Sequence, residues 1–254
     1  MTLCSTKPCS LFSTLIFRIA LVIFLLAGFE ADAQQMETND LLSKIEIDKA
    51  AYIKKVKEEL PRLNELIERE PRNVDAYKLR ASHYLQLNEY EKMVADYSRI
   101  IELVPNDIKT YLNRAQAYFQ LELYDKSLAD ADKVLKTESD NFNAYDAHLA
   151  RFMVYSKREQ YEKAIATLTD ILKFKPDDEW AYQRRADTYR QIKQYEKAIA
   201  DYTHIIKMAP NFTYGYFGRA EVYKATGEPE KAAADIKTAR EILRKRDEWL
   251  LKNP

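Results

Sequence analysis

Three histidines and two cysteines are the residues in this chain whose types could support metal binding or nucleophilic catalysis. The histidines are His83, His148 and His204, and none has a second ligand at the spacing that zinc sites use. The cysteines, Cys4 and Cys9, both lie near the start of the chain. No glycine-rich phosphate loop and no Ser/His/Asp motif is present. The sequence therefore predicts no enzymatic activity, no cofactor and no metal site.

Arginine and aspartate recur at matched positions, with each aspartate sixteen residues after its arginine. A ladder of arginines could bind phosphate or nucleic acid. We favour instead an ion pair between two helices, because both residues are missing from the third copy, where His148 and Thr167 stand. A backward alignment from Tyr161 would place Arg151 there instead. The even balance of 40 basic and 40 acidic residues also argues against a nucleic-acid partner. The four pairs are Arg80/Asp96, Arg114/Asp130, Arg185/Asp201 and Arg219/Asp235.

These pairs belong to an internal repeat, whose similar segments begin at Tyr90, Tyr124, Tyr161 and Tyr195. These tyrosines are 34, 37 and 34 residues apart. A period of about 34 residues is the sequence signature of a stacked array of helical hairpins. If position 1 of the repeat is Val74, aromatic or large residues fall at positions 4 and 11, and small residues mostly at position 8. Spacings of four and three place them on one stripe of a helix. The predicted stripe consists of Tyr77, Ala81, Tyr84; Tyr111, Ala115, Tyr118; Tyr145, Leu149, Phe152; Tyr182, Ala186, Tyr189; and Tyr216, Ala220, Tyr223.

Prolines and polar residues mark the ends of the predicted helices. A proline cannot continue a helix, so Pro71, Pro105, Pro176 and Pro210 are each expected to end a second helix. The following polar residues are suited to cap the next helix: Asn73, Asn106, Asp177 and Asn211.

The aromatic and small stripe, the Tyr-Glu-Lys-Ala-Ile segment and the terminal proline resemble the tetratricopeptide repeat. The resemblance implies an all-α solenoid of helix-turn-helix units in a right-handed superhelix, with the first helices lining a concave groove that binds peptides or proteins. We expect five repeats over residues 74–240, preceded by a degenerate N-terminal helical cap at 36–73 and followed by a capping helix at 241–254. The expected repeat boundaries are 74–107, 108–141, 142–178, 179–212 and 213–246.

Some proteins of this family hold a C-terminal carboxylate with a lysine and asparagine clamp. Lys78 and Asn113 match two of five clamp positions, whereas Ser82, Asn143 and Ala147 do not. We therefore expect no full clamp and keep only an anionic contact at Lys78. Aromatic residues among polar ones are typical of an interface, although Phe119 and Phe217 could equally pack between repeats. The predicted partner-binding residues are Lys78, Asn113, Gln116, Phe119, Asp146, Trp180, Gln183, Asp187, Arg190, Tyr214, Phe217 and Glu221.

The N-terminal segment 1–33 resembles a signal peptide. Lys7 and Arg18 precede an apolar run of eleven residues at 19–29, and Ala31-Asp-Ala33 fits a signal peptidase site. Cleavage is expected after Ala33. Eleven helical residues rise about 16 Å, which is too short to span a bilayer. The alternative is that residues 1–29 stay as a membrane anchor.

These observations predict an exported scaffold or adaptor, periplasmic or secreted, that binds a protein or peptide partner. The alternative is a membrane-tethered assembly factor that retains residues 1–29. The identity of the partner does not follow from the sequence.

Overall fold

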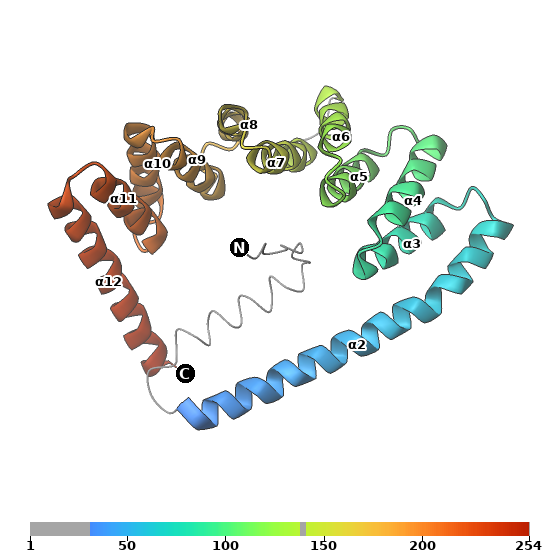
Figure 1. Ribbon diagram of the computed structural model, residues 1–254, viewed down its shortest axis with the longest axis horizontal. Helices are drawn as coiled ribbons and strands as arrows, with labels where there is room; N and C mark the ends of the chain where they lie inside the picture. Colours follow the sequence, from blue (N-terminus) through green and yellow to red (C-terminus); the bar gives the residue numbers. More distant parts are fainter. Residues whose placement is uncertain (1–30, 138–140, 254) are drawn as a thin grey trace, which may run out of the picture. The chain divides into compact units, whose positions relative to one another are not determined.

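The computed structural model describes residues 31–137 and 141–253, with side chains from 48 to 137 and from 143 to 253. The predicted signal peptide or anchor at residues 1–30 lies outside the described residues. The described residues form eleven helices and no strand (Figure 1). They divide into two compact units, one ending at Leu123 and one beginning at Tyr124. No helix within these described ranges is long and apolar enough to cross a membrane.

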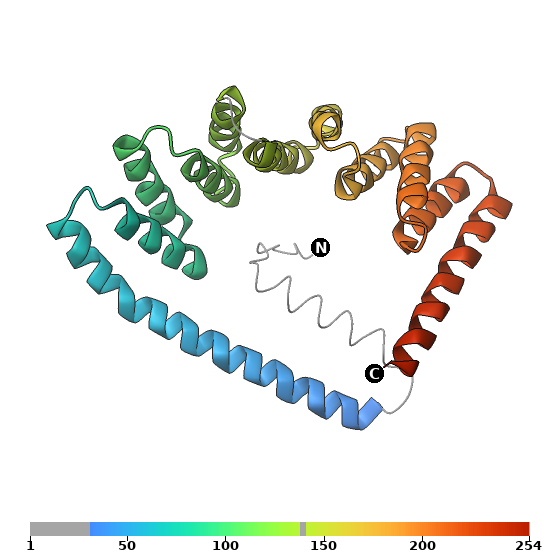
Figure 2. The same cartoon turned by 180° about the vertical axis from the view of Figure 1, so that it is seen from behind.

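The first unit begins with one long helix and continues with shorter ones. Helix α2 (Ala31–Arg69) contains Pro61 and runs without interruption (Figure 2). It is followed by α3 (Val74–Leu87), α4 (Tyr90–Leu103) and α5 (Ile108–Gln120). Each helix packs on the next one in sequence.

Helix α2 and a short turn occupy most of the span 36–73. The side chain of Glu59 lies 2.9 Å from Nε2 of His83, and Asn64 accepts a hydrogen bond from Arg80 at 2.8 Å. Both contacts join α2 to α3. Because α2 packs on α3 as α4 packs on α5, it takes the place of the second helix of an earlier hairpin.

The second unit consists of seven helices, each packed on its neighbours in sequence. First helices (α7, α9, α11) alternate with second helices (α6, α8, α10, α12). The bounds are α6 (Tyr124–Lys136), α7 (Asn141–Lys157), α8 (Tyr161–Phe174), α9 (Glu179–Gln191), α10 (Tyr195–Met208), α11 (Thr213–Ala225) and α12 (Pro229–Lys252).

Small side chains allow the helices to approach closely, as the stripe predicts. The alanines at position 8 are fully buried, and large residues of the second helices fill the space beside them. In the first unit these fillers are Met93, Tyr97 and Ile100; in the second they are Leu168, Ile171, Tyr202 and Ile205.

The helix N-caps differ by one residue from most of the predicted ones. Asn73 does cap α3, because its side chain accepts a hydrogen bond from the amide of Ala76 at 3.0 Å. The side chains of Asp107 and Asp178 cap α5 and α9 in the same way. The N-cap of α11 is Phe212, whose side chain makes no capping bond. Three predicted caps were therefore wrong, each lying one residue too early: Asn106, Asp177 and Asn211.

The turns between first and second helices establish the register of all five hairpins. Each turn has one residue with positive φ, and the amide that follows it donates to the carbonyl of a tyrosine five residues earlier, a common way to end a helix. The positive-φ residues are Asn88, Glu122, Glu159, Lys193 and Gly227. The accepting tyrosines are Tyr84, Tyr118, Tyr155, Tyr189 and Tyr223.

This register contradicts the predicted stripe in the third hairpin. Tyr155, and not Phe152, occupies position 11, so positions 4 and 8 are His148 and Phe152 and not Tyr145 and Leu149. The physical reason is the length of α7, which has 17 residues against 13 or 14 in the other first helices. The three additional residues of this unit extend α7 at its start. The alignment counted backward from Tyr161, which places Arg151 at the arginine position, is therefore correct.

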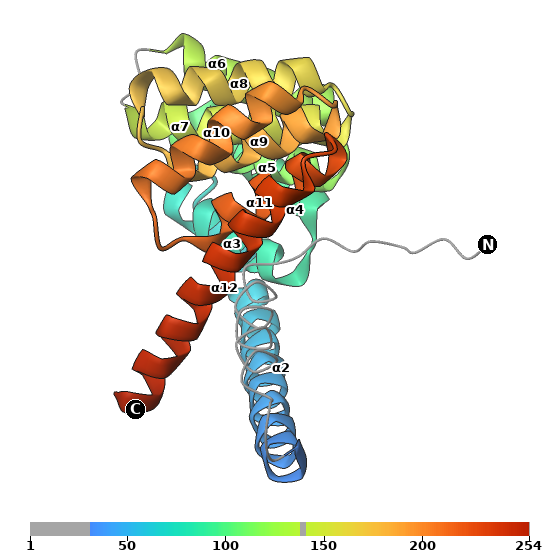
Figure 3. The same ribbon diagram turned by 90° about the vertical axis from the view of Figure 1, so that its left-hand side faces the viewer.

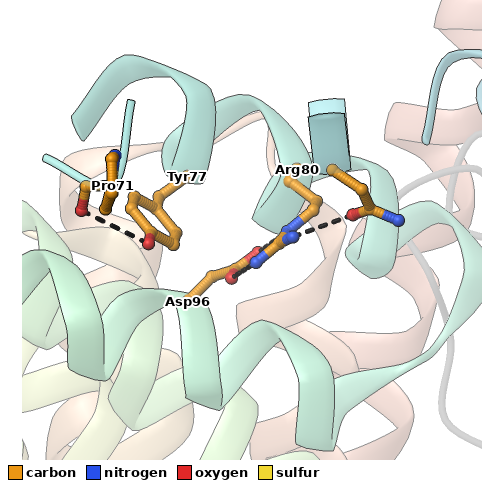
Figure 4. Close-up of polar contacts among 5 residues, drawn as sticks. Pro71, Tyr77, Arg80 and Asp96 are labelled. Atoms are coloured by element: carbon orange, nitrogen blue, oxygen red, sulfur yellow. Dashed lines mark hydrogen bonds and ion pairs between the residues drawn. The ribbon is translucent and has the colours of Figure 1, made fainter. Parts of the chain in front are cut away.

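Three of the four predicted ion pairs form within a unit, each with two parallel hydrogen bonds. Arg80 donates to Asp96 at 2.9 and 2.6 Å (Figure 4). Arg185 and Asp201 are joined at 2.8 Å twice, as are Arg219 and Asp235. The remaining pair, Arg114 and Asp130, has one member in each unit.

Each of these arginines also contacts the second helix of the preceding hairpin, at the residue sixteen positions earlier. Nη1 donates to Asn64 from Arg80, to Ser98 from Arg114, to Thr169 from Arg185 and to Thr203 from Arg219, at 2.8 to 3.1 Å. Arg80, Arg185 and Arg219 therefore each join three consecutive helices. Their guanidinium groups are engaged with the chain's own carboxylates, which favours ion pairing over a phosphate-binding ladder.

The third hairpin keeps the arginine but lacks the aspartate. Arg151 is at position 7, and its Nε lies 3.5 Å from Oδ1 of Asp132 in the preceding hairpin. Position 23 is Thr167, whose hydroxyl donates to the carbonyl of Lys163 in its own helix at 2.8 Å. Within the described residues, the buried Nε of Arg151 has no hydrogen-bond acceptor. The prediction that arginine and aspartate are both absent from this hairpin was therefore wrong.

Candidate binding face

Six of the predicted partner-binding residues lie together on α9 and α11. We call this surface the α9–α11 face and define it as Gln183, Asp187, Arg190, Tyr214, Phe217 and Glu221. Their spacings of three or four residues place them on one side of each helix, and α9 and α11 contact each other. Figure 1 shows α7, α9 and α11 following one another on the same side of the second unit.

Asp187 is the centre of the α9–α11 face. Its Oδ1 accepts a hydrogen bond from the hydroxyl of Tyr202 at 2.7 Å, and its Oδ2 accepts one from Tyr214 at 2.6 Å. Nη2 of Arg190 lies 3.7 Å from the same carboxylate. Because the two tyrosines come from α10 and α11, the carboxylate is positioned by three helices and is ordered before any partner arrives.

Tyr202 reaches Asp187 from the core. Its side chain is fully buried, and its ring packs against Gly218 of α11, where an added Cβ would lie 2.6 Å from Cζ. The absence of a side chain at Gly218 therefore leaves the space that the ring occupies. Burial raises the pKa of Tyr202, and the hydrogen bond to Asp187 raises it further.

Tyr214 is half-buried and has the same electrostatic setting. Burial raises its pKa, followed by the hydrogen bond to Asp187, while Gln183 lowers it. Both phenols therefore stay protonated at neutral pH and act as donors to Asp187. The ring of Tyr214 stacks on Phe212, with centroids 6.2 Å apart and planes at 22°.

Arg190, Phe217 and Glu221 are exposed, and Gln183 is half-buried. Phe217 is 37% exposed, so it is not packed away between hairpins. The Arg190 side chain is 43% exposed, and Glu221 pairs with Lys224 at 2.7 Å. An exposed aromatic ring beside a fixed carboxylate and an exposed cation is an arrangement suited to binding a polypeptide.

Trp180 lies elsewhere in the packing. It is half-buried, and its ring meets that of Phe152 edge to face, with centroids 5.4 Å apart. The guanidinium of Arg184 lies 5.7 Å from its ring centre. The ring therefore helps to hold α7 against α9 and contributes little free surface.

The corrected register of α7 shifts both Asp146 and Met153 by three positions. Asp146 falls at position 2, where burial raises its pKa and nearby Lys175 lowers it. Position 9, which holds Asp187 on α9 and Glu221 on α11, is Met153 on α7, and Met153 is 41% exposed. The sequence analysis missed Met153; the alignment backward from the second helix would have found it.

Four of the predicted residues belong to the first unit: Lys78, Asn113, Gln116 and Phe119. Lys78 forms an ion pair with Asp107 at 2.7 Å, so its charge is engaged by the N-cap of α5. Burial raises the pKa of Asp107, but the hydrogen bonds that its carboxylate accepts from Lys78 and Thr110 lower it more. The pKa of Asp107 therefore lies below its ordinary value. Asn113 and Gln116 are exposed, and Phe119 is half-buried. No group of three His, Cys, Asp or Glu side chains that could hold a metal ion occurs in the described residues.

Sequence-family models match the chain over three of its stretches. One model of the tetratricopeptide repeat matches residues 108–141 and 181–212, and a second matches residues 60–108. The chain contains tetratricopeptide repeats. The match from residue 60 includes the last part of α2. No curated protein matches the chain in sequence.

Solved tetratricopeptide structures show the same fold. The MamA protein of Desulfovibrio magneticus has a TM-score of 0.58 and 21% identity, covering 68% of this chain and 97% of that one. YrrB, described as a tetratricopeptide protein with an unusual peptide-binding site, has a TM-score of 0.55 and 19% identity, covering 71% and 91%. A tetratricopeptide protein of Parabacteroides merdae is 25% identical at a TM-score of 0.50, covering 79% and 76%. The architecture is that of a protein-interaction α-solenoid.

Proposed function

We propose that this protein is an exported adaptor that binds a peptide or protein segment on the α9–α11 face. The observation that supports this most is the Asp187 carboxylate, which Tyr202 and Tyr214 hold in place beside the exposed ring of Phe217. A surface ordered in advance avoids part of the entropy loss on binding. Met153 extends the apolar part of this surface on α7.

The contacts indicate the kind of segment that fits. Phe217 and Met153 offer apolar area to a side chain of the partner, while Asp187 can still accept a hydrogen bond, because each carboxylate oxygen has two lone pairs. Arg190 lies too far from Asp187 for a hydrogen bond and is available to an acceptor on the partner. We therefore propose a ligand segment with an apolar residue flanked by polar groups.

Capture of the partner tests this function. The double variant Arg190→Ala/Phe217→Ala changes two exposed side chains of the face and leaves the hydrogen bonds of Tyr202 and Tyr214 to Asp187 intact. We expect it to lose most of the partner that the wild-type chain captures from its native compartment. A matched control is Glu196→Ala/Lys207→Ala, which changes two exposed residues of the second helix α10. Equal capture by both double variants would rule out the proposed face.

The tyrosine contacts provide a finer test. Tyr214→Phe keeps the ring but removes the hydrogen bond to Asp187. If the positioned carboxylate matters, Tyr214→Phe weakens capture while circular dichroism at the assay temperature shows the helices intact. Unchanged capture by this variant, with a loss in the double variant, would restrict the site to Phe217 and Arg190.

Export rests on the sequence of the N-terminal segment that ends at Ala33. The proposed mature chain begins at Gln34, and intact-mass measurement of the protein isolated from its native compartment tests this. A chain that retains Met1 and sediments with membranes after alkaline carbonate treatment would instead support the membrane-tethered assembly factor.

A further inference from the structure

The turn between α10 and α11 contains a sequence that can accept an N-linked sugar. The acceptor motif is an asparagine, then any residue other than proline, then a serine or threonine. In the whole sequence only Asn211 meets this condition, in the segment Asn211-Phe212-Thr213. The segment lies between the end of α10 and the first residue of α11.

This turn lacks the helix cap that the equivalent turns have. The turns before α3, α5 and α9 end in Asn73, Asp107 and Asp178, whose side chains accept a hydrogen bond from the following helix. Before α11 the cap position holds Phe212, which makes no capping bond. A missing cap makes a helix less stable, so the need to start α11 does not explain the residues of this turn.

Stacking explains the aromatic residue but not its neighbours. The ring of Phe212 lies against that of Tyr214, with centroids 6.2 Å apart. This contact accounts for an aromatic side chain at position 212. It places no requirement on the asparagine before that position or on the threonine after it.

The two polar groups of the segment are both unengaged. Within the described residues, neither the side-chain amide of Asn211 nor the hydroxyl of Thr213 makes a hydrogen bond. The hydroxyls of other threonines in the second unit donate to carbonyls of their own helices, as those of Thr169 and Thr188 do. Asn211 is exposed and Thr213 is half-buried, so the amide is accessible to an enzyme.

The surroundings leave room for a large group on Asn211. Asn211, Phe212 and Thr213 line an open cleft of about 700 Å³, whose other wall is part of α12. Helix α12 extends beyond α11 (Figure 3). The backbone at Phe212 is extended, with φ −90° and ψ 106°. A sugar chain attached at this turn therefore requires no movement of the helices.

We propose that Asn211 is an N-linked glycosylation site. The inference rests on the export part of the proposed function, because this modification occurs on surface segments of exported proteins. The donor is a sugar carried on a lipid diphosphate. A bond forms between Nδ2 of Asn211 and C1 of the sugar, while the bond between C1 and the diphosphate oxygen breaks. The lipid diphosphate leaves, and Nδ2 gives up one proton to a base of the transferase.

The chemistry gives Thr213 a positioning role. An amide nitrogen is a weak nucleophile, because its lone pair is delocalised into the carbonyl group. The transferase must therefore hold the Asn211 side chain closely. The hydroxyl of Thr213 can both donate and accept a hydrogen bond, and it offers a second point of contact on the same segment.

Mass spectrometry of the full chain isolated from its native compartment tests the site. We expect an intact mass above that of the chain beginning at Gln34, by a whole number of sugar residues. The added mass should be lost in Asn211→Gln and in Thr213→Ala, whereas Thr213→Ser keeps a hydroxyl and should keep the sugar. Asn106 is an internal control, because it is exposed at the same place in the turn before α5 but is followed two residues later by Ile108. It should carry no sugar.

The outcomes separate this site from the proposed function. A chain that begins at Gln34 without added mass would overturn the glycosylation site and leave export intact. A chain that retains Met1 without added mass would contradict both. Added mass that persists in Asn211→Gln would also overturn the site, and tandem mass spectrometry of the peptide containing position 211 shows directly whether the sugar is there. Circular dichroism of each variant verifies that the helices are intact.

Discussion

The ring of Tyr202 lies directly against Gly218, in space that any larger residue would need. An added Cβ at Gly218 would come within 2.6 Å of Cζ and 2.9 Å of Cδ1 of that ring. The close approach matters because it lets the Tyr202 hydroxyl pass from the core to Asp187 on the α9–α11 face. The surface of α9 and the packing of α10 on α11 therefore depend on the same contact.

Gly218→Ala should therefore be destabilising. Overpacking a well-packed core costs about 1–3 kcal/mol, although alanine normally favours a helix over glycine. Chemical denaturation measures the change in the free energy of unfolding. Tyr202→Leu removes the ring, so the double variant should be less destabilised than the sum of the two single variants. Additive effects would show that the ring and the glycine are not in contact.

Thr167→Asp should stabilise the third hairpin. The new carboxylate would occupy the position at which Asp96, Asp201 and Asp235 receive two bonds from an arginine, and Arg151 has a buried Nε to donate. A hydrogen bond to a charged group contributes about 1.5–3 kcal/mol before the cost of burying the carboxylate is subtracted, so we expect a net gain of about 1 kcal/mol. The control Thr167→Asn carries no charge and should gain less. A destabilised Thr167→Asp variant would contradict the corrected register.

The pair of Arg185 and Asp201 provides a complementary test. The side chains are 16% and 8% exposed, and removing one partner leaves the other buried without its counterion. Asp201→Ala alone should cost about 3–5 kcal/mol. The double variant Arg185→Ala/Asp201→Ala should be more stable than Asp201→Ala. Simple additivity in denaturant unfolding would rule out the pair as a coupled unit.

Much of this fold is predictable from the sequence because the repeat is explicit. The pattern of Tyr77, Ala81 and Tyr84 recurs in four of the five first helices, and prolines follow the second helices α2, α4, α8 and α10. The third hairpin deviates because its extra residues could be placed at either end of α7. The sequence contains no local signal for that choice, and only the turn at Glu159 and the hydrogen bond to Tyr155 decide it.

The site was less predictable than the fold. Residues on one helix, such as Asp187 and Arg190, follow from the helical period. The hydrogen bonds to Asp187 do not, because their donors come from α10 and α11 and depend on the absence of a side chain at Gly218. Trp180 looked like a surface aromatic, but its contact with Phe152 depends on the corrected register of α7.

The third hairpin should also be sensitive to acid. Burial lowers the pKa of His148 below its ordinary value of 6.5, Arg151 and Lys173 lower it further, and Asp170 and Asp132 oppose this. A group with a lowered pKa contributes stability that is present above the unfolded pKa and is lost as pH falls through the folded pKa. The free energy of unfolding should therefore decrease as pH drops below about 6.5.

His148→Tyr isolates this effect, because the other four hairpins have tyrosine at the same position. The variant should keep its stability at pH 8 and lose part of the decrease below pH 6.5. Thermal melts of the two proteins at matched pH values measure the difference. Identical acid dependence in both proteins would assign the effect to other groups.

The most direct test of the proposed binding face is site-specific photo-crosslinking in the native compartment. A photoreactive residue replaces Phe217 on α11 in one variant and Glu196 on α10 in another, both exposed positions. The account predicts a crosslinked partner from position 217 and none from position 196. Crosslinking from position 196 alone, or from neither position while the partner still copurifies, would contradict binding at the α9–α11 face.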